Sequence, residues 1–126
     1  MKTWNEYLEE VKIYNEASMN DNKFWEIVGS KLKSTQLKNN LKKLSDDELE
    51  NFQDKLWEKI EVLSKLPELK ESYSSDTVDD IASGIIWRGK EEFDNVRSEK
   101  TSITSKLANS IMNDTVTNEL MRRDSE

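Results

Sequence analysis

Hydrophobic residues recur at three- and four-residue intervals along most of this chain, which is the pattern of amphipathic α-helices. The clearest run follows Ser45. Ser45 and Glu48 have the spacing of a capping box, and Pro67 disfavours helical backbone in the residue before it. We therefore predict a long helix over residues 46–64. Its core positions are Leu49, Phe52, Leu56, Ile60 and Leu63.

The N-terminal third of the chain predicts two or three further helices. Thr3 and Glu6 form another capping-box pair, which places a helix within residues 1–20. The polar cluster Asn20-Asp21-Asn22 begins the next helix. Its apolar positions are Phe24, Trp25, Val28 and Leu32. The same spacing continues at Leu37, Leu41 and Leu44, either as a short third helix or as the end of the second.

In the C-terminal half, Ser74-Ser75-Asp76 begins a helix that we expect to run past Gly84 and Gly89. Its apolar positions are Val78, Ile81, Ala82, Ile85, Ile86, Phe93 and Val96. Each glycine costs about 1 kcal/mol relative to alanine in a helix, so another backbone approaches closely or the helix bends. A last helix is expected to begin at Thr101-Ser102, with an interruption at Asn113-Asp114-Thr115. The fold class is therefore all-α, with five or six helices in an antiparallel bundle or an orthogonal helical array.

The composition limits which partners and which catalytic chemistry the chain can have. The 126 residues suffice for a single domain, 1–126, and carry a formal net charge of −7. This charge makes nucleic acid and membrane surfaces unexpected partners. Because the chain contains no Cys and no His, thiol and imidazole catalysis and the usual zinc sites are excluded. The first twenty residues hold no long apolar run, so we expect a cytoplasmic protein. We also expect it to work without a cofactor.

Three stretches carry a family resemblance. They are Asn22-Lys23-Phe24-Trp25-Glu26-Ile27, Leu41 to Leu49 with Phe52, and Ser75-Asp76 through Phe93. Together they resemble the bacterial domain of unknown function 4240, over a core of about residues 22–120 to which residues 1–20 are peripheral. The family's glycine-rich turn is replaced here by Lys70 to Ser74. The resemblance implies a bacterial setting in which small domains accompany toxin–immunity or defence systems, and it assigns no catalytic residue.

The predicted helix over 46–64 has an acidic outer face, on which we select Glu50, Asp54 and Glu61 as candidate partner-binding residues. A rigid acidic face steers toward a basic protein, and it also keeps a small protein soluble. The composition alone does not favour either interpretation. The family resemblance favours the interpretation that this face binds a basic partner protein.

Trp87 and Arg88 are the second candidate partner-binding pair. Trp87 points away from the apolar positions of its predicted helix, toward polar neighbours. Tryptophan and arginine are enriched among interface hot spots, so an exposed pair is typical of an anchor for a partner or for a homodimer. The alternative is that the N-terminal helix or the C-terminal turn covers both residues.

Two charge clusters have ordinary explanations. The carboxylates Asp46, Asp47, Glu50, Asp76, Asp79 and Asp80 lie at two helix starts, where local capping explains them better than a metal site does. The basic stretch of Lys31, Lys33, Lys38, Lys42 and Lys43 includes no aromatic residue and is interpreted as a solvated face rather than an anion-binding patch.

The function that the sequence favours is a non-enzymatic, acidic protein-binding module. In its most concrete form it is an immunity-type protein that neutralises a cognate bacterial toxin by occlusion. The alternatives are an inhibitor of a host defence protein, encoded by a phage or mobile element, and a metal-dependent enzyme that uses carboxylates only.

Overall fold

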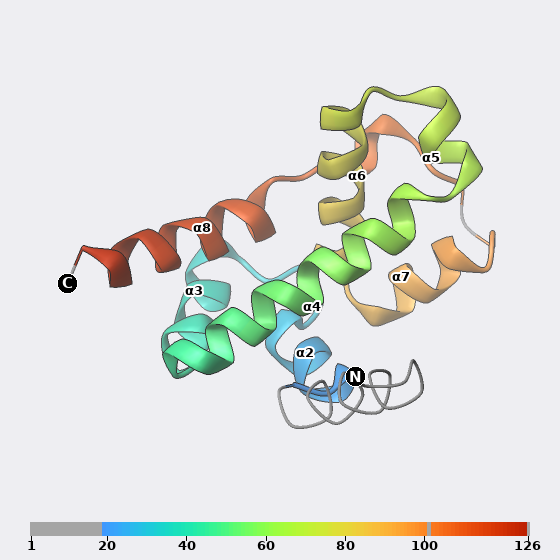
Figure 1. The fold of residues 1–126 in the computed structure, drawn as a ribbon. Coiled ribbons are helices and arrows are strands. Elements are labelled where there is room, and N and C mark those ends of the chain that lie inside the picture. Colours follow the sequence, from blue (N-terminus) through green and yellow to red (C-terminus); the bar gives the residue numbers. More distant parts are fainter. Residues whose placement is uncertain (1–18, 101, 126) are drawn as a thin grey trace, which may run out of the picture.

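The computed structural model describes residues 19–100 and 102–125, which contain helices and no strand (Figure 1). The elements are α2 (Asp21–Val28), α3 (Ser34–Lys42), α4 (Asp46–Ser64), α5 (Pro67–Ser72), α6 (Ser75–Trp87), α7 (Lys90–Arg97), the 3-10 turn η1 (Ser105–Leu107) and α8 (Ile111–Asp124). The predicted all-α class is confirmed, with seven α-helices in this part of the chain instead of five or six. The helix predicted within residues 1–20 falls almost entirely outside the described residues.

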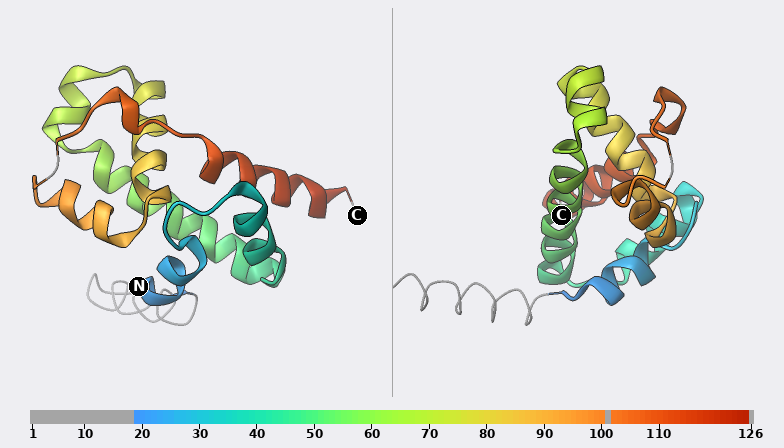
Figure 2. Two further views of the ribbon diagram at one scale, coloured as in Figure 1. Left: turned by 180° about the vertical axis from the view of Figure 1, so that it is seen from behind. Right: turned by 90° about the vertical axis from the view of Figure 1, so that its right-hand side faces the viewer.

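Helix α4 has the predicted bounds and the predicted cap. The Ser45 hydroxyl accepts a hydrogen bond from the Glu48 amide, and the Glu48 carboxylate accepts one from the Ser45 amide, both at 3.1 Å. These reciprocal bonds satisfy two amide groups that a helix start otherwise leaves free. All five predicted core positions of α4 are buried. Helix α6 packs against α4 and crosses it, rather than lying along it, in the views of Figures 1 and 2.

The prediction of one continuous helix from Ser75 to Val96 is wrong. Helix α6 ends at Trp87, and α7 begins after Gly89, whose φ of 111° belongs to a region that other residues rarely adopt. The expectation of a close backbone approach is confirmed at Gly84, where a Cβ atom would lie 1.8 Å from the carbonyl oxygen of Leu107. The apolar residues of both helices are nevertheless buried, since α7 turns its own face to the same core.

The last helix also differs from its prediction. Ile103 does not lie in a helix; its amide donates a hydrogen bond to the Glu68 carboxylate at 3.1 Å. Helix α8 starts at Ile111 and continues through Asn113-Asp114-Thr115. The buried Thr115 hydroxyl finds its partner within the helix, because it donates to the Ile111 carbonyl at 2.6 Å.

The short helices α2, α3 and α5 complete the fold. Helix α2 ends at Val28, so Leu32 lies in the following loop, and Leu37 and Leu41 belong to a separate short helix, α3. Helix α5 was not predicted; Pro67 begins it, which suits a residue without an amide proton. Helix α3 packs against α8, so segments from opposite ends of the described chain lie side by side (Figure 2).

Candidate functional site

The outer side of α4 carries an exposed acidic stripe. At 3.6 residues per turn, Glu50, Asp54 and Glu61 fall within about 40° of one another, and Trp57 lies about 20° to one side. All four side chains are exposed, and 51% of the Trp57 surface is accessible. We call these four residues the α4 acidic face. Trp57 was not among the candidate residues selected from the sequence; the acids one turn before and after it are the signal that it faces solvent.

The α4 acidic face keeps most of its charge. No ion pair involves Glu50 or Asp54 in the part of the chain that the structure describes, and Glu61 contacts only the exposed Lys65, at 3.2 Å. Such an exposed pair contributes little to stability and is readily exchanged for another cation.

Three other acids of α4 are paired within the protein. Asp46 contacts Arg123 at 2.9 Å, Glu58 contacts Lys55 at 3.6 Å, and Glu48 pairs with Lys23. The hydrogen bond from Lys23 and the cap at Ser45 lower the pKa of Glu48 to about 2. Apart from the exposed Asp47 in the first turn, the unpaired negative charge of this helix therefore lies on the α4 acidic face.

Trp87 and Arg88 make contacts within the protein. The Trp87 indole donates a hydrogen bond to the Leu32 carbonyl, and the Arg88 guanidinium donates to the carbonyls of Gly84 and Leu107, all at 2.8 Å. Both side chains are half-buried. The segment between α2 and α3 covers Trp87, and this segment is neither of the two coverings that the sequence suggested.

Lys59 is a buried cation that sequence reasoning did not select. Only 6% of its surface is accessible, and its Nζ atom lies 5.3 to 5.6 Å from the ring centres of Phe24, Trp25 and Phe93. Its ammonium also contacts the Asp21 carboxylate at 3.2 Å. Burial alone would raise the pKa of Asp21, but the charges and hydrogen bonds of Lys59 and Lys55 lower this pKa below its ordinary value. This cluster joins α2, α4 and α7, and the signal for it was a lysine at an apolar position of α4.

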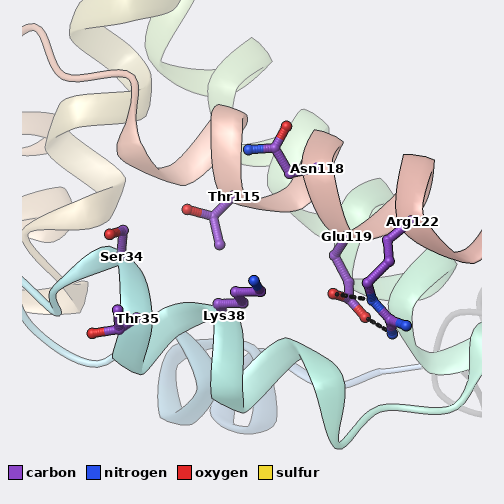
Figure 3. Close-up of a pocket in the computed structure, with 7 residues that line it drawn as sticks. All are labelled: Ser34, Thr35, Lys38, Thr115, Asn118, Glu119 and Arg122. Atoms are coloured by element: carbon purple, nitrogen blue, oxygen red, sulfur yellow. Dashed lines mark hydrogen bonds and ion pairs between the residues drawn. The ribbon is translucent and has the colours of Figure 1, made fainter.

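A pocket of about 480 Å³ lies between α3 and α8 (Figure 3). Its lining residues are Ser34, Thr35, Lys38, Thr115, Asn118, Glu119 and Arg122. Glu119 is 2% exposed and accepts hydrogen bonds from Arg122, at 2.6 and 3.2 Å, and from Arg123, at 3.1 Å. These bonds outweigh the effect of burial and lower the pKa of Glu119 to about 2. Sequence reasoning had selected only Lys38 from this set, as part of the basic stretch.

The two acidic clusters considered for metal binding are not assembled into such a site. Within residues 19–100 and 102–125, no three Asp or Glu side chains converge in a way that would hold a metal ion. Asp46 pairs with Arg123, while Asp76, Asp79 and Asp80 are exposed along α6. No helix in the same residues combines the length and the apolar character needed to cross a bilayer.

Comparisons with protein-family models, with curated proteins and with solved structures find no match to this chain. The resemblance to domain of unknown function 4240 therefore stays a prediction.

Proposed function

We propose that this chain is a protein-binding domain that recognises a basic surface of another protein through the α4 acidic face. The observation that carries the proposal is the exposed Trp57 among Glu50, Asp54 and Glu61 on one side of a capped helix of 19 residues. A helix with a complete capping box and a buried apolar face presents these side chains on a preformed backbone, so binding does not have to order the helix itself.

The two kinds of residue have different roles in this proposal. The carboxylates accelerate encounter with a basic partner and select its orientation, an effect that salt screens. Trp57 supplies contact area, and tryptophan is among the residues most often found at the energetic centre of an interface. A symmetric homodimer through this face is disfavoured, because it would oppose two sets of carboxylates.

The partner that we propose is a bacterial toxin with a basic active-site surface, which the domain neutralises by occlusion. The acidic net charge and the family resemblance support this immunity-type role. An inhibitor of a host defence protein would use the same face, and the identity of the bound protein separates these two forms of the proposal.

The test compares two charge-matched triple variants. In the first, Glu50, Asp54 and Glu61 are replaced by Lys; in the second, the exposed acids Glu71, Asp79 and Asp124 of other helices are replaced by Lys. We expect wild type and the second variant to capture the same basic protein from the native host and to relieve its toxicity, while the first variant does neither. Equal capture by all three proteins would refute the proposal.

The kinetics of the captured complex provide a second check. The first variant should slow association far more than it accelerates dissociation, and the wild-type association rate should fall as salt is added. A salt-independent association rate would remove electrostatic steering from the proposal. Trp57→Ala should instead accelerate dissociation, since it removes contact area and no charge.

A further inference from the structure

The pocket between α3 and α8 contains a cation that the fold does not use. The Lys38 side chain is exposed, and no carboxylate lies within ion-pair distance of it in the described part of the chain. In Figure 3 it lies between the two helices, with the hydroxyl residues Ser34 and Thr35 one turn earlier on α3 and Asn118 on the facing helix.

The second cation of the pocket is held in place by a buried acid. Glu119 accepts two hydrogen bonds from Arg122, and Arg123 donates a third to the same carboxylate. The carboxylate is thereby occupied, while the Arg122 side chain remains 42% exposed at the pocket. A guanidinium fixed in this way loses little conformational freedom when it binds an anion.

The charges and the size of the pocket indicate the class of ligand. Lys38 and Arg122 against Glu119 leave a net charge of +1 on the lining residues, in a protein whose overall charge is −7. Phosphate groups are bound by arginine, by lysine and by hydroxyl donors, all of which this pocket contains. A volume of about 480 Å³ falls within the range of small-molecule sites and exceeds what one inorganic anion needs.

We propose that this pocket binds a phosphate group, with Lys38 and Arg122 as the charged contacts and Ser34, Thr35 and Asn118 as neutral donors. The lining residues include no aromatic ring on which a base could stack, which disfavours a single-stranded nucleic acid as the source of the phosphate. The site is separate from the α4 acidic face and does not depend on the proposed protein partner.

The test is a titration of the full chain with inorganic phosphate, followed by ¹⁵N-resolved NMR at constant ionic strength. We expect saturable shifts at Ser34, Thr35, Lys38, Asn118 and Arg122. Lys38→Gln should weaken binding at least tenfold, whereas Lys42→Gln, the same charge change one turn later on α3 and outside the pocket lining, should change it less than twofold. Both variants are expected to fold, because both side chains are exposed.

A second titration, with glucose 6-phosphate against glucose, distinguishes the source of the phosphate. Tighter binding of the sugar phosphate than of inorganic phosphate assigns the pocket to an organic phosphate, and equal or weaker binding assigns it to the free anion. The absence of saturable shifts with inorganic phosphate would overturn the proposal. Equal weakening by Lys38→Gln and Lys42→Gln would also overturn it, since binding would then follow the general charge of α3.

Discussion

The guanidinium of Arg123 donates a hydrogen bond of 2.8 Å to the carbonyl oxygen of Leu44. The same group donates to the Leu41 carbonyl at 3.1 Å, so a side chain of α8 satisfies backbone oxygens at the end of α3. A cation at this end of a helix also interacts favourably with the helix dipole.

Replacement of Arg123 by Ala should therefore lower the free energy of unfolding by about 1.5–3 kcal/mol, the range for hydrogen bonds that involve a charged group. Arg123→Lys should recover part of this loss, since the ammonium keeps the charge but not the fork of donors. Urea denaturation measures both values. Lys42→Ala, at the exposed end of α3, is the control and should change stability by no more than about 0.5 kcal/mol. An Arg123→Ala loss as small as this control would show that solvent replaces the contacts.

We expect Trp87 to contribute to the folding stability of the protein. Trp87→Ala should cost about 3 kcal/mol of folding free energy, because the indole packs against the core and binds the Leu32 carbonyl. Trp87→Phe keeps most of the packing and should cost about 1 kcal/mol, the value of one hydrogen bond. Thermal and urea melts provide the comparison. A Trp87→Ala protein that folds as wild type does but loses partner binding would contradict this prediction and support the hot-spot interpretation of Trp87 and Arg88.

The lowered pKa of the Glu119 carboxyl group predicts that the folded protein loses stability in acid. Its pKa is lowered from 4.5 to about 2 in the folded protein, so between these values the unfolded chain binds more protons than the native state. The stabilisation is present above pH 4.5 and disappears as the pH falls toward 2. Glu119→Gln should be less stable than wild type at neutral pH, and its stability should fall less steeply over this acid range. Parallel pH profiles for the two proteins would contradict the assignment.

Neighbouring positions of α6 should respond to alanine in opposite ways. Gly84→Ala places a Cβ atom against the Leu107 carbonyl and should cost about 3 kcal/mol, because η1 has to move. The Ser83 hydroxyl is buried and has no hydrogen-bond partner in the part of the chain that the structure describes. Ser83→Ala should therefore be neutral or stabilising by about 1 kcal/mol. A destabilised Ser83→Ala protein would reveal a partner for the hydroxyl, such as an internal water molecule.

Helix α4 is the element that the sequence predicted most accurately, because its signals are local. The cap at Ser45 and the apolar spacing after it depend on neighbours within four residues, so α4 has the bounds that its sequence predicts. The break at Gly89 escaped prediction because the apolar spacing continues in register from Ile86 to Phe93, and only the backbone angle separates the two helices. Helix α8 shows the opposite case, in which tertiary packing maintains a helix across a polar segment of low helix propensity.

The two candidate sites also differed in how well the sequence predicted them. The α4 acidic face lies on one helix, so the spacing of Glu50, Asp54 and Glu61 sufficed to predict that they share a surface. The pocket combines residues of α3 and α8, which no local pattern relates. Lys38 was therefore interpreted as part of a solvated face, and Glu119 was not selected from the sequence at all.

The pairing of α3 with α8 has a consequence for how the protein is made. Arg123 and Leu41, which are hydrogen-bonded, are 82 residues apart in the chain. At ~5–20 residues per second, a ribosome that has completed Leu41 needs roughly 4–16 s to reach Arg123. During this interval the side of α3 that will contact α8 has no partner, so the nascent chain depends on late docking. Final folding should accordingly be slower than in helical bundles that pair neighbouring helices.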